Sequence, residues 1–179
     1  MTDDAPTTTP ASSAPRHHRH AGVLWLVGGI SVITVVMLAW PAWQRSRDLQ
    51  RLEQAGAVFD TRTQTPSWMK LQGTTFDSAT IESLARITTL EDLVLDESNV
   101  TDADLAALST LIDLKRLSLS RTAITDTGLT QLAILPRLTT LVLNSSYHVT
   151  DEGLETLAQL RSLEEISLLD TTVTLPGLI

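Results

Sequence analysis

The chain of 179 residues contains no cysteine. Disulfide bonds, thiolate metal sites and cysteine catalysis are therefore excluded, although this absence says little about the compartment of the protein. Histidine is scarce as well, because His148 is the only histidine after residue 20. A histidine-based nucleophile relay or a multi-histidine metal site cannot be assembled from one such side chain. We therefore expect no cofactor and no metal site there.

Other catalytic patterns are also missing. Glu164 and Glu165 are adjacent, so on a strand they would point to opposite faces and could not form the carboxylate pair of a glycosidase. There is no glycine-rich phosphate loop, because Gly128, Gly153 and Gly177 recur at a fixed period and are better explained as positions at the start of helices. The sequence thus predicts that the protein is not an enzyme.

Positive charge is low. Thirteen Lys and Arg residues stand against 21 Asp and Glu residues, a net charge of -8. Residues 60–179 hold eight of these basic residues and 17 of the acids. Affinity for nucleic-acid phosphates rests on Lys and Arg, so we expect no nucleic-acid partner.

The sequence predicts a disordered tail over residues 1–20. Residues 1–14 are mostly Thr, Ser, Pro and Ala, a composition that cannot bury enough apolar surface to offset chain entropy. The segment Arg-His-His-Arg-His at residues 16–20 could suggest a metal site, but a basic flank beside a membrane explains its arginines as well. We adopt the membrane flank.

Residues 21–43 form a run of 23 residues without a charge. At 1.5 Å per residue, about 20 helical residues cover a hydrocarbon core of roughly 30 Å, so the run fits one transmembrane helix. Trp25 near one end and Trp40 and Trp43 near the other suit the aromatic belts of membrane proteins. A cleavable signal peptide would have a shorter apolar core and small residues before its cleavage site. We expect a permanent single-pass anchor.

The orientation of this anchor depends on few charges. Two arginines precede the run and three follow it, a difference too small to decide. Partial charge on the three N-terminal histidines favours an inside N-terminus. The repeat domain is then expected to be extracytoplasmic.

Residues 44–65 are expected to form a juxtamembrane helix and a linker. Residues 45–55 contain helix formers without Gly or Pro, and Gly56 is a suitable helix stop. Residues 58–66 are rich in Thr and resemble a linker.

Three consecutive segments of 24 or 25 residues then repeat one pattern: residues 101–124, 125–149 and 150–173. Each begins with Thr-Asp and carries leucines at matching positions. Self-similarity at this period is the signature of a solenoid built from stacked repeats. It fixes the fold class before any other argument.

Each repeat carries two hydrophobic periods. In the first segment the leucines from Leu105 to Leu114 step by three, which predicts a helical or near-helical stripe. Leu117 and Leu119 alternate with polar residues, which predicts a short strand. Thr101 and Asp102 precede the stripe, where their oxygens can accept hydrogen bonds from the first free N–H groups of a helix. Each repeat is therefore predicted to be a helix followed by a strand. Ten side chains are expected to point into the core: Leu108, Leu111, Leu117, Leu119, Leu132, Leu141, Leu143, Leu157, Ile166 and Leu168.

Counting back by 24 residues extends the array toward the N-terminus. It places a capping strand at 69–71 and a divergent first repeat at 77–100, while residues 174–179 remain as a stub. A column of hydroxyl side chains follows the strands, and we expect it to bond backbone groups left unpaired as the chain leaves each strand. The column is Thr74, Ser98, Thr122, Ser146 and Thr171.

The motif T-D-x-G-L-x-x-L-x-x-L-x-x-L-x-x-L-x-L-x-x-T-x-[IV] resembles that of bacterial leucine-rich-repeat proteins. It is similar to their cysteine-containing subfamily in length and in its Thr-Asp start, but it has no cysteine. The resemblance covers roughly residues 66–179. It implies an α/β fold, a right-handed curved solenoid with a parallel sheet and a ligand surface on its concave face.

Two departures from the family pattern matter. The first repeat has Asp77 and Ser78 in place of Thr-Asp, and the last repeat stops at Ile179 without a closing helix. We expect the second departure to leave an apolar end that a longer chain, a partner or a second copy could cover. Self-association through this end is therefore one of the expectations.

The outward-facing row of the strands is the surface left for function, because these positions are free of core packing. A merely solvated face is the alternative interpretation, but such a face would not need apolar side chains. The candidate residues for partner binding are Trp68, Lys70, Asp92, Val94, Asp96, Arg116, Ser118, Arg121, Val142 and Asn144.

Two functions remain open. The first is a membrane-tethered module that binds a protein or peptide ligand across its concave strands. The second is a recognition or regulatory subunit for a partner enzyme or a cell-envelope polysaccharide. A polysaccharide site favours exposed aromatic residues, and only Trp68 and Tyr147 are available, so we rank it second.

Asp92 and Arg116 occupy equivalent positions one repeat apart. Neighbouring strands lie about 4.8 Å apart, so the two side chains should be adjacent on the sheet. They are then either the centre of a binding patch that also includes Asp96 and Arg121, or an internal ion pair. The sequence alone leaves both interpretations open.

Overall fold

The computed structural model describes residues 44–60, 62 and 65–174, all of which belong to one compact unit. The expected N-terminal tail and membrane span, residues 1–43, lie outside the described residues, as does most of the C-terminal stub. Among the described residues, no helix combines the length and the apolar character needed to cross a bilayer.

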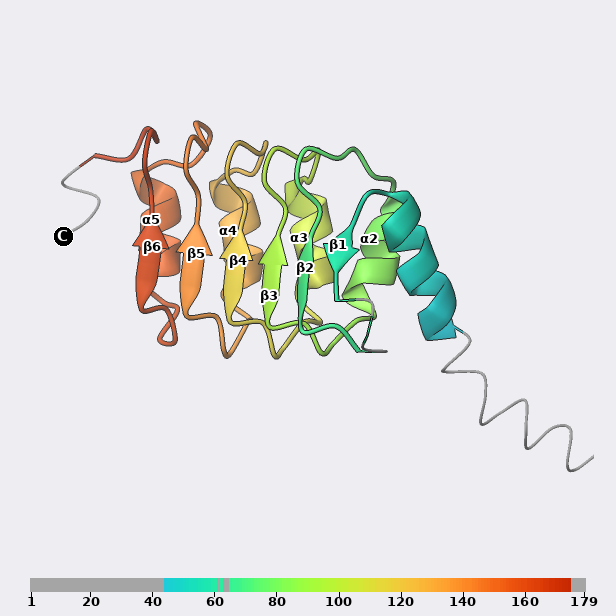
Figure 1. Ribbon diagram of the computed structural model, residues 1–179. Helices are drawn as coiled ribbons and strands as arrows, with labels where there is room; N and C mark the ends of the chain where they lie inside the picture. Colours follow the sequence, from blue (N-terminus) through green and yellow to red (C-terminus); the bar gives the residue numbers. More distant parts are fainter. Residues whose placement is uncertain (1–43, 61, 63–64, 175–179) are drawn as a thin grey trace, which may run out of the picture. The chain divides into compact units, whose positions relative to one another are not determined.

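Six strands form one sheet in the order of the sequence, and the helices of the repeats lie behind it (Figure 1). The first two strands pair antiparallel and all later neighbours pair parallel. The strands are β1 (Val58–Phe59), β2 (Trp68–Lys70), β3 (Asp92–Val94), β4 (Arg116–Ser118), β5 (Thr140–Val142) and β6 (Glu165–Ser167). The helices of the repeats are α2 (Ser78–Ala85), α3 (Asp102–Leu108), α4 (Asp126–Leu132) and α5 (Asp151–Leu157).

Each repeat therefore contributes one helix and one strand, as predicted. We number the repeats 1 (residues 77–100), 2 (101–124), 3 (125–149) and 4 (150–173). The three-residue step of the leucines continues beyond the helix, because Leu111 N–H donates to Leu108 and Leu114 N–H to Leu111, both at 3.0 Å. These bonds span three residues, like those of a 3₁₀ turn. They bring every third side chain back to the core.

The core is a stack of leucines between the helices and the sheet. Leu105, Leu111, Leu119 and their counterparts in repeat 3 are fully buried. Of the ten residues predicted to point inward, eight are buried. The other two, Ile166 and Leu168 around strand β6, are only partly buried because no further repeat covers them within the described residues. The eight are Leu108, Leu111, Leu117, Leu119, Leu132, Leu141, Leu143 and Leu157.

The N-terminal end of the stack is closed by residues 44–60. The chain is helical over residues 44–54, as expected, and Leu52 of this helix is fully buried. Asp48 pairs with Arg86 at 2.9 Å, which links the helix to repeat 1. β1 follows and buries Phe59. The expectation of a linker over residues 58–66 is corrected at its start, because alternation over two residues is too short to reveal a strand.

Hydrogen bonds from each Thr-Asp pair link successive repeats. Thr125 donates its backbone N–H to Oδ1 of Asp102 at 2.9 Å and its hydroxyl to Oδ2 at 2.6 Å. The same two bonds join Thr150 to Asp126 and Thr174 to Asp151. We call these three pairs the Asp–Thr ladder. The predicted capping role is thus only part of the function of this motif, since the aspartate also holds the threonine of the next repeat.

The glycine of the motif is explained by the same contact. A methyl group built on Gly128 would overlap Oδ1 of Asp102, and one built on Gly153 would overlap Oδ1 of Asp126. An aspartate in one repeat therefore favours glycine at the fourth position of the next. These glycines make room for a carboxylate, which refines their assignment as helix-start positions.

Repeat 2 shows the converse. Its fourth position is Asp104, and the residue in repeat 1 that would face it is Ser78 instead of aspartate. Thr101 therefore has no ladder partner, and Asp104 accepts its backbone N–H at 2.9 Å and its hydroxyl at 2.7 Å. Asp77 caps α2 by accepting from the backbone N–H of Thr80 at 2.8 Å. Both departures of repeat 1 are thus compensated locally.

The column of hydroxyl side chains has the predicted structural role. Thr74, Ser98, Thr122 and Thr171 each donate to the carbonyl oxygen three residues earlier, and Ser146 donates to Leu119. The donors lie where the chain leaves the strands. They satisfy carbonyls that the sheet does not pair.

Candidate partner-binding face

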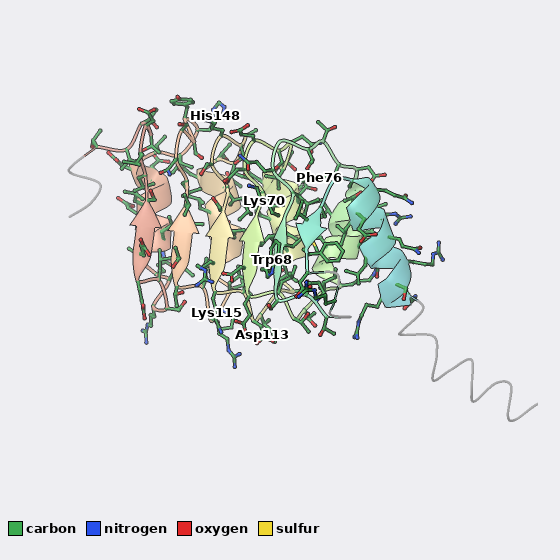
Figure 2. The ribbon with its side chains drawn as sticks, in the orientation of Figure 1. Trp68, Lys70, Phe76, Asp113, Lys115 and His148 are labelled. Carbon is green, nitrogen blue, oxygen red and sulfur yellow. The ribbon has the colours of Figure 1, made fainter. Side chains whose placement is uncertain are left out.

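The face of the sheet opposite the helices, which we call the open face, carries two rows of side chains. Strand pairing sets one row as Trp68, Asp92, Arg116, Thr140 and Glu165, and the other as Lys70, Val94, Ser118, Val142 and Ser167. Figure 2 shows Trp68 and Lys70 at the β2 end of this face. Of the ten candidate residues, seven lie in these two rows, and the other three, Asp96, Arg121 and Asn144, follow the strands.

Asp92 and Arg116 are neighbours, as the repeat spacing predicted, and they form an ion pair. One guanidinium nitrogen lies 2.6 Å from Oδ2 of Asp92, and Nε contacts Oδ1. The arginine side chain is 63% exposed, so water screens the pair. Surface pairs of this kind contribute at most about 1 kcal/mol to stability.

Three other candidate residues also serve contacts between repeats. Oδ1 of Asp96 accepts from the hydroxyl of Ser118 at 2.6 Å and from the backbone N–H of Ser120 at 2.8 Å. Oδ1 of Asn144 accepts in the same way from repeat 4, from the hydroxyl of Ser167 and the backbone N–H of Leu169. These side chains stabilise the stacking of the repeats and are not free for a ligand.

Arg121 is separated from Arg116 along the strand direction. It lies in the turn after β4, with a positive φ of 55°, and pairs with Glu97 at 3.0 Å. Glu97 occupies the same position in the preceding turn and has a φ of 58°. The patch expected at Asp92, Asp96, Arg116 and Arg121 is therefore not one cluster. Asp92 pairs with Arg116 where the strands begin, Arg121 pairs with Glu97 in the turns after the strands, and Asp96 bonds Ser118 and Ser120.

Four of the ten candidates have no polar bond to another described residue that would occupy them. Trp68 is 41% exposed, and Lys70 is exposed beside it in the structure. Val94 pairs with Lys70 across the strands, and Val142 lies two strands further along the same row. This set, Trp68, Lys70, Val94 and Val142, is the part of the predicted site that remains available to a partner.

A second line of ion pairs lies just before the strands, at the end of the sheet where each strand begins. Lys115 bonds Glu91 at 2.7 Å and Arg137 bonds Asp113 at 2.7 Å. Figure 2 shows Lys115 and Asp113 at this end of the sheet. The hydrogen bond and charge of Lys115 hold the pKa of the Glu91 carboxyl below its ordinary value. Sequence reasoning missed both pairs, although their 24-residue spacing was a usable signal.

A shallow cavity of about 320 Å³ lies at the other end of the strands, among the turns that follow them. It is lined by Arg121, Thr122, Ser145, Tyr147 and His148, and Tyr147 is 62% exposed. The one-residue insertion in repeat 3 was the sequence signal for this cavity, because it lengthens the turn that carries Tyr147 and His148. Within the part of the chain that the structure describes, no group of three metal-binding side chains is present.

The sequence profile of a family described as Leucine Rich repeat matches residues 111–133. This segment contains β4 and α4, and the strands of the other repeats continue the register of β4 on both sides. These are leucine-rich repeats. A search of curated protein sequences found no match to the chain.

Two solved leucine-rich-repeat structures are similar to the chain. One is internalin C2 (inlC2) from Listeria monocytogenes str. 4b F2365, with 31% identity over 56% of this chain and 43% of the internalin, at a TM-score of 0.43. The other is an internalin (inlF) from the same strain, with 22% identity over 63% of this chain and 37% of the internalin, at a TM-score of 0.45. The chain thus spans less than half the length of either internalin.

Proposed function

We propose that the leucine-rich repeats form a protein-interaction module that binds a protein or peptide across the open face. The observation that carries this proposal is the set of Trp68, Lys70, Val94 and Val142, which lies on that face without a task in the fold. Aromatic anchors surrounded by aliphatic groups are typical of the energetic centre of an interface. The assignment to the bacterial Thr-Asp type of repeat belongs to the proposal and is supported by the Asp–Thr ladder.

The engaged residues narrow the expected contact. The partner should rest on the row from Lys70 through Val142, where apolar side chains face solvent. Asp92 and Arg116 are expected to contribute less, because a partner would first have to break or desolvate their ion pair. We therefore expect the apolar side chains of this row to contribute more to partner binding than the Asp92–Arg116 pair.

A pair of matched double variants tests the open face. Val94→Lys with Val142→Lys places two long charged side chains on the apolar row. The control, Ile112→Lys with Ile134→Lys, changes two exposed isoleucines that lie outside the strands, at 55% and 62% exposure. Proteins captured by the tagged full chain from membranes would be quantified for parent, face variant and control.

The proposal expects at least one protein whose capture falls more than tenfold with the face variant and stays unchanged with the control. Purification of that protein and a direct affinity measurement would complete the test. Equal capture by all three forms, or loss only with the control, would place the interaction elsewhere on the molecule.

The proposal includes a membrane tether at residues 21–43 and a repeat domain outside the cytoplasm. The support is the length of the uncharged run and its flanking tryptophans. The full chain should remain in the membrane after carbonate extraction, and protease added from the outer side should degrade the repeats. A mature protein that lacks the residues before Trp43 would show a cleaved signal peptide instead.

Recognition of a cell-envelope polysaccharide is the second candidate, and the cavity at Tyr147 favours it. An exposed aromatic ring beside Arg121 and His148 could hold an acidic sugar. Tyr147→Ala should then abolish binding to acidic envelope polysaccharide without affecting capture of a protein. Unchanged polysaccharide binding would exclude this cavity.

A further inference from the structure

The last strand, β6, leaves one side of the sheet unpaired within the described residues. Inside the sheet, the carbonyl oxygen just before each strand accepts two N–H groups of the next repeat. Glu91 O accepts from Lys115 and Arg116 at 2.8 and 2.9 Å, and Thr139 O accepts from Glu164 and Glu165 at 2.9 and 3.0 Å. Glu164 O is the next oxygen in this series. No described residue donates to it.

The donors at the other end of the strand follow the same rule. Leu143 and Ser145 donate their N–H groups to Ser167 and Leu169 of the following repeat, at 2.9 and 2.7 Å. Their counterparts in repeat 4 are the N–H groups of Leu168 and Asp170. Among the described residues these donors have no acceptor, so the edge presents the full pattern that an added parallel strand would bond.

The charges along this edge reproduce an arrangement that is filled elsewhere in the molecule. Repeat 1 carries three acids, Glu91, Asp92 and Glu97, and each pairs with the basic residue 24 positions later, Lys115, Arg116 and Arg121. Repeat 3 has Thr139, Thr140 and Ser145 at these positions. Repeat 4 returns to acids, with Glu164, Glu165 and Asp170.

The backbone of the two acidic repeats also corresponds. Asp170 has a φ of 57°, and all four repeats share this turn, with 58° at Glu97 and 55° at both Arg121 and Ser145. Glu164, Glu165 and Asp170 are all exposed, and none forms an ion pair with a described residue. The last described strand therefore presents the acidic half of a pairing whose basic half repeat 2 supplies for repeat 1.

Apolar surface accompanies the charges. Leu163, Ile166, Leu168 and Val173 are only partly buried, whereas their counterparts in repeat 3 are fully buried. Leu169 is 70% exposed beside them. A strand added at β6 would cover this surface with its own apolar residues.

We propose that the β6 edge docks a protein partner that adds a parallel strand carrying a basic triplet. The triplet is two consecutive Lys or Arg residues followed five residues later by a third, the spacing of Lys115, Arg116 and Arg121. The backbone of the partner pairs with the edge, its apolar residues cover Ile166 and Leu168, and its basic side chains meet the three acids. This inference concerns a different surface from the open face and does not depend on it.

A second copy of this chain does not fit this edge. Its only matching triplet lies in repeat 2, an interior repeat whose basic side chains are paired with repeat 1 and whose strand is bonded on both sides. Another β6 edge would bring acid against acid. The partner is therefore a different protein with a basic edge strand.

Disulfide trapping tests the proposal, because the chain has no cysteine of its own. The probe is a peptide with the sequence of residues 111–124, LIDLKRLSLSRTAI, in which cysteine replaces Ser118. Strand register places this position beside Ser167 if the peptide extends the sheet, at a separation that a disulfide can span. The full chain carries Ser167→Cys, and the matched control carries Ser118→Cys in the interior strand.

We expect the peptide to cross-link to Ser167→Cys at least tenfold faster than to Ser118→Cys. A peptide with glutamate at its three basic positions should lose this advantage. Adding Glu164→Lys, Glu165→Lys and Asp170→Lys to the protein should reverse the preference toward the acidic peptide. Circular dichroism checks that the triple change leaves the fold intact, and the two peptides on the Ser167→Cys form decide the question without it.

Equal rates at the two cysteines would overturn the proposal, and so would rates that ignore the charges of the peptide. Rapid disulfide dimerisation of the Ser167→Cys chain without peptide would replace it by edge-to-edge pairing of two copies. Loss of open-face binding in the earlier variants would leave this result unchanged.

Discussion

The two halves of the sheet use equivalent positions differently. Between β3 and β4 the charged side chains are paired between repeats, as in Asp92 with Arg116 and Glu97 with Arg121. Around β5 the same positions hold hydroxyl groups, and around β6 they hold acids that form no ion pairs with described residues. Equivalent positions thus stabilise the contact between repeats 1 and 2, whereas in repeat 4 they carry acids that are unpaired among the described residues.

The largest difference should appear in the core. Leu119 is fully buried between repeats 1 and 3, while Leu168 at the same position of repeat 4 is partly buried. Truncating a buried leucine costs about 2 to 5 kcal/mol, and the cost falls with exposure. Leu119→Ala should lower the urea midpoint of unfolding far more than Leu168→Ala. Equal midpoints would show that the end of the stack is as well covered as its centre.

The next effect concerns the contact between Gly128 and Asp102. Gly128→Ala introduces a methyl group where the carboxylate lies, and overpacking of this kind costs about 1 to 3 kcal/mol. Adding Asp102→Ser should recover much of the loss, because repeats 1 and 2 already combine serine with a side chain at the facing position. Thermal unfolding of the single and double variants measures both steps. A double variant less stable than Gly128→Ala would contradict the steric explanation.

The ion pairs should matter less. Asp92→Ala together with Arg116→Ala is expected to change the free energy of unfolding by at most about 1 kcal/mol, because the pair is screened by water. Glu165→Ala, at the unpaired position of the same row, should leave stability unchanged. A loss of several kcal/mol from the double variant would mean that the pair is more tightly coupled to the sheet than its exposure indicates.

The smallest effect is a pH dependence at the two ends. The pKa of Asp151 lies below its ordinary value of 3.8, chiefly because its carboxylate accepts the backbone N–H of Thr174, and the pKa of Glu91 lies below 4.5 because of Lys115. A carboxyl with a lowered pKa in the folded state contributes stability that is present above the ordinary value and is lost as the pH falls through the lowered one. The melting temperature should therefore decrease as the pH is lowered below about 4.5.

Asp151→Asn and Glu91→Gln should each reduce the loss of melting temperature at acid pH. The pH dependence of the melting temperature above pH 6 should stay as in the parent. Melting curves recorded from pH 7 to pH 3 compare the variants with the parent. A slope identical to the parent in both variants would assign the acid sensitivity to other carboxyls.

Periodicity predicted most of the fold because each repeat restates it. The leucine steps located every helix and strand from Trp68 onward, and the spacing of 24 placed Asp92 beside Arg116. β1 escaped prediction because it lies outside the repeats and has only two residues. The Asp–Thr ladder also escaped, since a capping motif read within one repeat does not reveal a partner in the next.

The candidate site was predicted in position but not in availability. Strand alternation placed seven of the ten side chains in the two rows of the open face, but it cannot tell an exposed side chain from one bonded to a neighbouring repeat. Asp96 and Asn144 illustrate this limit, because each accepts bonds from the repeat that follows it. Val94 and Val142 cannot form such hydrogen bonds, so they stay available to a partner where most of the charged candidates do not.

The steric relation between aspartate and glycine constrains how this array can lengthen by duplication. A tandem copy of repeat 3 would set its glycine against the aspartate of the original, as Gly153 already faces Asp126. A tandem copy of repeat 2 would instead set Asp104 of the copy against Asp102 of the original, two carboxylates in one space. Repeat 2 is therefore best accommodated behind a repeat that lacks the aspartate, so rearranging the order of the repeats would cost stability.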